Sequence, residues 1–144
     1  MNKLLIPVLL FTAILFSAVN ISAQSADETH IVYVQTWKMN SMPTGEEGKA
    51  FADMLKKQTD ALKGNSKLLS QRIVRHNWGS DSRDLLIITE FKNLEDLFTF
   101  SGEMNAAYEK AFTKEENDKF DGLWMKYVGQ HSDEIYHEVA GTRK

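Results

Sequence analysis

The chain has 144 residues, contains no cysteine and carries a formal net charge of −3 at neutral pH. The lack of cysteine excludes disulfides, thiolate metal sites and cysteine nucleophiles. A mildly acidic chain without a run of basic residues is a poor candidate for binding nucleic acid or an anionic membrane surface. Its length suits a single domain that can bury a core without covalent cross-links.

The start of the chain is typical of a secretory signal peptide. Lys3 supplies a positive charge, an apolar run extends from Leu4 to about Val19, and Ala23 is a small residue at the expected cleavage site. An uncleaved anchor is the alternative, but polar residues dilute a run that would need about 20 mostly apolar residues to span a bilayer. We therefore expect export to the periplasm or medium, removal of residues 1–23, and no membrane contact afterwards. Residues 24–29 are expected to form a flexible linker.

Residues 30–144 are expected to form one domain that begins with a strand and a helix. His30–Met39 is rich in β-branched and aromatic residues, which favours a strand. Thr44 and Glu47 have the spacing of a capping box, in which each side chain bonds the backbone N–H of the other. The helix that follows carries its apolar side chains on one face. These are Phe51, Met54, Leu55 and Leu62.

Two further strands are predicted in the middle of the chain. Leu68–Trp78 and Asp84–Phe91 are separated by a short loop of turn-forming residues, which indicates an antiparallel hairpin. Within the loop, Arg83 could pair with Asp81 or Asp84 and stabilise the turn. Alternatively, Trp78 and Arg83 could guard the entrance of a binding site.

The next stretch is predicted to be helical, in two parts. One helix begins at Asn93 and is interrupted at Ser101–Gly102, after which the helical spacing of apolar residues resumes. Thr113 and Glu116 form a second capping box and open the most regular helix of the chain. Its apolar face comprises Phe120, Leu123, Trp124, Tyr127 and Val128, with Gly129 as its expected C-cap.

A closing strand is predicted over Glu134–Val139. The element order is therefore β-α-β-β-α-β with additional helix before the last strand. This order predicts an α+β, ferredoxin-like fold with an antiparallel four-stranded sheet and helices on one face. The other face would expose a large apolar patch unless something covers it.

Two segments strengthen this expectation. Trp78–Phe91 (WGSDSRDLLIITEF) and His131–Tyr136 (HSDEIY), together with the element order, resemble exported members of the dimeric α/β-barrel superfamily. The resemblance spans roughly Ile31–Val139 and implies a homodimer in which two ferredoxin-like sheets face each other and close a barrel. The superfamily includes cofactor-free monooxygenases, haem-degrading enzymes, chlorite dismutase-like proteins and stress-response barrels. The resemblance therefore concerns fold more than activity.

Strand alternation predicts a site inside that barrel. Successive side chains point to opposite faces of a sheet, and we assign the small branched residues Val32 and Val34 to the helix-packed face. The residues assigned to the barrel interior are Tyr33, Gln35, Trp37, Arg72, His76, Trp78 and Glu90. Aromatic walls with a few polar groups suit a small apolar or aromatic ligand. A packed dimer interface, with Arg72 and Glu90 as an ion pair, is the alternative.

Candidates for proton or cofactor chemistry are few. His76 is the best candidate for an acid or base because its ordinary pKa lies near neutrality, although a structural role is the alternative. No cofactor is expected, since the chain has no phosphate-binding glycine loop, no dinucleotide fingerprint and no nucleophile elbow. Haem ligation by His76 or His131 would be an analogy with the superfamily, without a haem-specific motif.

His131, Asp133 and His137 resemble a metal-ligand set in composition, since two histidines and a carboxylate can hold iron or zinc. On an extended strand, however, the first and last would lie about 20 Å apart. A turn at His131–Asp133 and no metal is the preferred interpretation.

Three functions follow from these features. The favoured one is an exported homodimer that binds a small molecule in the barrel without catalysis. The second is a cofactor-free oxygenase or isomerase that uses His76 in the same cavity. The third is an interaction module whose barrel is filled by side chains.

Overall fold

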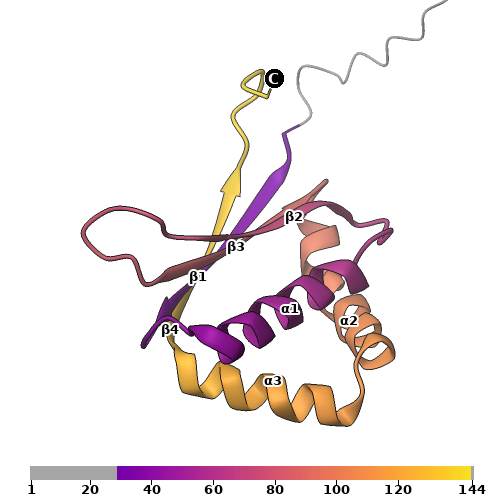
Figure 1. The fold of residues 1–144 in the computed structure, drawn as a ribbon. Helices are drawn as coiled ribbons and strands as arrows, with labels where there is room; N and C mark the ends of the chain where they lie inside the picture. Colours follow the sequence, from indigo (N-terminus) through magenta and orange to yellow (C-terminus); the bar gives the residue numbers. More distant parts are fainter. Residues whose placement is uncertain (1–28, 144) are drawn as a thin grey trace, which may run out of the picture.

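The computed structural model describes residues 29–143 and has the predicted order of elements (Figure 1). These are β1 (Ile31–Met39), α1 (Gly45–Ala61), β2 (Leu68–Arg75), β3 (Asp84–Phe91), α2 (Leu94–Ala111), α3 (Lys114–Tyr127) and β4 (Val128–His137). The order confirms the ferredoxin-like arrangement with one more helix before the last strand. The predicted signal peptide and, apart from Thr29, the predicted linker lie outside the described residues.

The four strands form one antiparallel sheet in the order β2-β3-β1-β4. The predicted hairpin of β2 and β3 is confirmed. All three helices lie on the same side of the sheet (Figure 1). We call that side the helix-covered face and the opposite side the open face.

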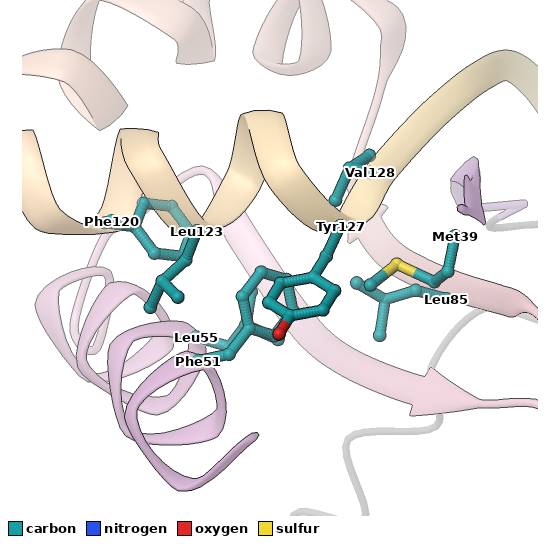
Figure 2. Packing of buried hydrophobic residues seen from close by; sticks show 8 residues of the cluster. All are labelled: Met39, Phe51, Leu55, Leu85, Phe120, Leu123, Tyr127 and Val128. Carbon is teal, nitrogen blue, oxygen red and sulfur yellow. The ribbon is translucent and has the colours of Figure 1, made fainter. Parts of the chain in front are cut away.

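The larger core cluster lies between two helices, α1 and α3, and the end of the sheet that holds Met39 and Leu85. Figure 2 shows aromatic and aliphatic side chains from α1 and α3 that meet residues of β1 and β3. Each fully buried side chain of this kind contributes about 2–3 kcal/mol through the removal of apolar surface from water. The buried members are Met39, Phe51, Leu55, Leu85, Phe120, Leu123, Tyr127 and Val128.

A smaller cluster fills the other end of the helix-covered face. Phe91 is completely buried and contacts Phe100 of α2 edge-to-face, with ring centroids 5.1 Å apart. Ile31 and Leu62 complete the cluster. The predicted apolar faces of α1 and α3 are thus confirmed, because Leu62, like Phe51 and Phe120 in the larger cluster, is buried.

The two predicted capping boxes differ in outcome. At α3 the Thr113 hydroxyl accepts from the backbone N–H of Glu116, and the Glu116 carboxylate accepts from that of Thr113, which confirms the prediction. At α1 the Thr44 side chain makes no capping hydrogen bond, so that prediction was wrong. The Glu47 carboxylate, the other half of the predicted box, instead accepts hydrogen bonds from Lys126 and Tyr127 of α3.

The second half of the chain corrects three predicted boundaries. α2 continues through Ser101–Gly102 without a break. A glycine inside a helix costs only about 1 kcal/mol, which the packing of Phe100 outweighs. Gly129 is not the C-cap of α3, because Val128 caps the helix and already begins β4. β4 therefore starts six residues earlier than predicted, and His131–Asp133 is strand rather than turn.

Within residues 29–143, no helix is both long enough and apolar enough to cross a bilayer.

Candidate functional site

The pairing register divides the predicted site between the two faces of the sheet. Gln35 lies opposite Ile87, which lies opposite Ile73. Arg72 lies opposite Ile88, which in turn lies opposite Val34. Directly paired residues share a face, so Gln35 and Arg72 point to opposite faces. The prediction that they line one cavity was therefore wrong.

The same register places the other predicted residues. Tyr33 and Trp37 share the helix-covered face with Gln35, whereas Glu90 shares the open face with Arg72. Val32 and Val34, assigned to the helix-packed face, instead lie on the open face. Alternation had separated the two sides of each strand correctly. It could not match the sides of one strand to those of the next, because pairing decides that match.

A cleft of about 340 Å³ opens on the helix-covered face, between the sheet and α2. Two of the predicted ligand residues, Tyr33 and Gln35, lie on its sheet side. Gln71 and Thr89 from the neighbouring strands join them. Most of the remaining lining is apolar: Phe91, Leu97, Phe98, Phe100, Ser101, Met104 and Ile135.

Tyr33 is held neutral in this cleft. Burial, followed by a hydrogen bond to Asp133 and the charge of that carboxylate, raises the pKa of Tyr33 to about 12. The phenol is therefore a hydrogen-bonding group rather than an anion at any physiological pH.

The other polar side chains of the cleft are also oriented. The Gln35 amide donates to Asp133 Oδ1 at 3.2 Å, and the Gln71 amide donates to Thr89 Oγ1 at 3.4 Å. Thr89 is only 3% exposed. Three strands thus present polar groups toward a pocket that is otherwise apolar.

Trp37 does not line the cleft. Its ring stacks on His131 with centroids 4.2 Å apart and meets Trp124 edge-on at 4.9 Å. Trp37 packs against the larger core cluster. Its position is that of a core residue.

Arg72 and Glu90 form the ion pair foreseen as the alternative, with a third partner. Arg72 Nη2 lies 3.5 Å from Glu90 Oε1, and Arg143, from the C-terminal segment, lies 2.7 Å from Glu90 Oε2. Burial acts to raise the pKa of Glu90, but hydrogen bonds from Arg143 and Ser70 and the charges of both arginines lower it overall. Glu90 is thus an ionised carboxylate, 8% exposed, on the open face.

His76 and Trp78 lie in the loop between β2 and β3, away from the cleft. The His76 ring contacts the backbone oxygen of Trp78 through Nε2, and its Nδ1 lies 3.8 Å from Asp84. Trp78 is 91% exposed. Neither residue lines the cleft beneath α2.

The charged residues of the same loop stabilise the turn. Arg83 donates to both carboxylate oxygens of Asp81, at 2.8 and 2.7 Å. Asp84 pairs instead with Lys38 at 2.6 Å. This arrangement agrees with the structural interpretation of the loop.

The suspected metal ligands do not converge. His131 Nε2 lies 3.4 Å from Asp133 Oδ2, but His137 lies farther along β4, opposite Ile31. In the described part of the chain, no three histidine or carboxylate side chains are grouped closely enough to hold an ion.

Nine of the eleven cleft residues escaped the sequence prediction of the site, among them Gln71, Thr89, Phe98 and Met104. Gln71 and Thr89 interrupt apolar strands at positions in register with Tyr33, but that relation appears only once the pairing of the strands is known. Phe98 and Met104 fall on the apolar spacing that predicts helix after Asn93, and in such a spacing a core residue cannot be told from a cleft residue.

The open face has an apolar centre between charged ends. Val32, Val34, Leu86 and Ile88 form this centre on the two middle strands, and each is only half-buried. Glu90 with its arginines lies at one end of the face, and Lys38 with Asp84 lies at the other. Val74 and Tyr136 extend the apolar surface onto the edge strands, with 41% and 52% exposure.

Comparison with known proteins bears on the fold. No protein-family model and no curated protein matches the sequence. Among solved structures, an uncharacterised NIPSNAP-like domain protein from Burkholderia xenovorans matches with a TM-score of 0.51 and 11% identity, over 80% of this chain and 90% of that chain. The chain thus shares its overall fold with that protein, and the element order and strand order of the fold are ferredoxin-like.

Two other solved structures match the chain with lower TM-scores. A dimeric ferredoxin-like protein from an uncultured marine organism is 13% identical, with a TM-score of 0.49, over 83% of this chain and 96% of that chain. A dimeric protein of unknown function with a ferredoxin-like fold from Bacteroides fragilis is 12% identical, with a TM-score of 0.46, over 74% of this chain and 94% of that chain.

Proposed function

We propose that the protein binds a small, uncharged, mostly apolar organic molecule in the cleft between the sheet and α2. The observation that carries this proposal is the convergence of Tyr33, Gln35, Gln71 and Thr89 on an apolar pocket of about 340 Å³. A concave apolar site with a few oriented polar groups is the usual form of a small-molecule site.

The lining also indicates the character of the ligand. It contains no lysine, arginine, histidine or carboxylate, so nothing in it compensates a charged ligand. Phe98 and Ile135 are 67% and 46% exposed beside the cleft, which gives an apolar entrance. A neutral ring or short chain with one hydrogen-bonding group fits these features.

Binding without catalysis is the form we favour. The enzyme alternative needs a base in the same cavity, and His76 does not line it. Tyr33, whose pKa is raised to about 12, is protonated near neutrality and cannot serve as a base there.

A neutral fluorescent probe, N-phenyl-1-naphthylamine, tests the proposal. We expect saturable binding that Ser101→Trp abolishes, because Ser101 is exposed on α2 and its enlargement fills the cleft. Ala106→Trp, an exposed position on the same helix outside the cleft lining, is the control and should bind the probe as the unmodified protein does. Unchanged binding by Ser101→Trp would refute the site.

We further propose that the protein is a homodimer joined through its open face. The half-buried centre formed by Val32, Val34, Leu86 and Ile88 is apolar surface that a second copy would remove from water. Ile88→Glu should yield a monomer by light scattering, with the far-UV circular dichroism unchanged. Leu94→Glu, at an exposed position of α2, should leave the dimer intact. A monomeric unmodified protein at micromolar concentration contradicts this part.

We also propose that the protein is exported, and only the signal-peptide character of residues 1–23 supports this part. Expression of the full chain should yield a mature protein outside the cytoplasm whose N-terminal sequence begins at Gln24. Recovery of the intact N-terminus in the cytoplasm argues against it.

A further inference from the structure

A second, larger cavity lies on the helix-covered face, between α1 and β2. Its volume is about 520 Å³, and it is separate in its lining from the cleft beneath α2. Its apolar wall includes Met39, Phe51, Leu55 and Leu85, four members of the larger core cluster, whose arrangement Figure 2 shows. The cavity is thus an opening at the edge of the core rather than a groove on a polar surface.

The rim of this cavity is cationic. Lys56, Lys63 and Arg75 lie on it with a single carboxylate, Asp60, which leaves a net charge of +2 in a chain whose total is −3. Asp60 is shared by both lysines, since Lys56 contacts one of its oxygens and Lys63 lies 2.6 Å from the other. Their hydrogen bonds lower the pKa of Asp60 to about 2, so it stays ionised.

Arg75, the third cation of the rim, differs from the two lysines in its partners. Within residues 29–143 its guanidinium has no hydrogen bond or ion pair, and the residue is exposed. It lies opposite Leu85 on β3 and therefore belongs to the helix-covered face. A guanidinium beside an apolar cavity is suited to a bidentate contact with a carboxylate.

One end of the cavity is closed by tightly packed backbone. A Cβ added to Gly48 would lie 2.8 Å from the backbone oxygen of Pro43, so the first turn of α1 rests directly on the β1–α1 connection. Met42 and Pro43 line this end. At this end of the cavity, the backbone of Gly48 is thus packed closely against that of Pro43.

We propose that this second cavity binds an amphipathic carboxylate, with the aliphatic chain on the apolar wall and the carboxylate at Arg75. The apolar wall gains affinity with each buried methylene, by about fourfold. The cationic rim selects a negative head group over a neutral or positive one. The two cavities thus differ in ligand class, because only this one has charged side chains on its rim.

Decanoate is the probe, and its binding to the mature protein, which begins at Gln24, is measured by calorimetry. We expect saturable binding, at least tenfold stronger than that of decyltrimethylammonium, which has the same chain and the opposite charge. Arg75→Gln should weaken decanoate binding about tenfold, the usual scale of a lost charge-assisted contact. Lys49→Gln is the control: it also removes one positive charge, but from a position on α1 outside the cavity lining, and should leave decanoate binding unchanged.

A blocking variant and a spectroscopic readout locate the site. Ala52 is exposed and lines the cavity, so Ala52→Trp should abolish decanoate binding without disturbing the core. In protein labelled at methionine methyl groups, a spin-labelled decanoate should broaden the NMR signals of Met39 and Met42. The signal of Met104, in the cleft beneath α2, should persist.

The two proposals fail separately. Ser101→Trp should leave decanoate binding intact, and Ala52→Trp should leave binding of the neutral probe intact. Absence of decanoate binding, equal binding of the cationic probe, or broadening of Met104 in place of Met42 would each overturn the carboxylate site. The first two results say nothing about the cleft beneath α2, whereas broadening of Met104 would mean that decanoate enters that cleft instead.

Discussion

The hydroxyl of Tyr127 donates a hydrogen bond to the carboxylate of Glu47, which joins the end of α3 to the first turn of α1. Lys126 lies 2.8 Å from the same carboxylate. The hydrogen bonds from Lys126 and then Tyr127 lower the pKa of Glu47. Glu47 therefore links two helices instead of capping its own.

Tyr127→Phe should lower the free energy of unfolding by about 1 kcal/mol at pH 7, the usual contribution of one hydrogen bond. The pKa of Glu47 is lowered from 4.5 in the folded protein, so its stabilising effect is complete above pH 4.5 and declines as the pH falls through the lowered value. The difference between Tyr127→Phe and the unmodified protein should therefore shrink in acid. Urea unfolding at pH 7 and pH 3 measures it, and an equal difference at both pH values contradicts the link.

The two threonines that precede helices provide a matched pair. Thr113→Ala removes the capping box of α3 and should cost about 1 kcal/mol of unfolding free energy. Thr44→Ala should cost much less, because the Thr44 side chain makes no capping bond. Thermal unfolding of both variants tests the contrast. Equal losses would mean that Thr44 caps α1 in solution.

Two of the four tyrosines should resist ionisation. Burial raises the pKa of Tyr108 to about 12, and burial together with Asp133 raises that of Tyr33 to about 12. A raised pKa favours the neutral folded form, so this contribution to stability is complete below pH 10 and is lost as the pH rises from 10 toward 12. Absorbance at alkaline pH should show the late ionisation, and Tyr33→Phe should remove one group from it. Four tyrosines that ionise together near pH 10 would contradict the burial.

Arg143 should control the charge state of Glu90. Arg143→Ala removes a 2.7 Å hydrogen bond, whereas the burial that opposes ionisation remains, so the pKa of Glu90 should rise. NMR titration of carboxylate carbons measures this change. Arg83→Ala, which removes an exposed arginine from the β2–β3 loop, is the control and should leave Glu90 unchanged.

The fold could be predicted because its signals are local. The apolar spacing of Phe51, Leu55 and Leu62 requires only a helix and one sheet to cover it, and the structure buries all three. The capping box at Thr113 likewise depends on a single turn. The boundary at Gly129 failed because a glycine commonly ends a helix, whereas here the strand had already begun.

The site could be predicted only in part, because it depends on how strands are paired. Tyr33 and Gln35 do line a cleft, but on the face opposite Arg72. A shift of one residue in the pairing of β2 with β3 would have placed Arg72 beside them. The pairing of β2 with β3 does contain a register shift, between Leu68 and Ser70, which no sequence pattern predicts.

The direct passage from α3 into β4 has a consequence for engineering. Val128 is at once the cap of the helix and the first residue of the strand, and a side chain on Gly129 would lie 2.7 Å from Asn40 Oδ1. No loop residue therefore separates α3 from β4, and the position of the helix fixes that of the edge strand. Peptide tags or extra domains would be accommodated between Gly79 and Ser80, which are both exposed, and would break the domain if placed after Tyr127.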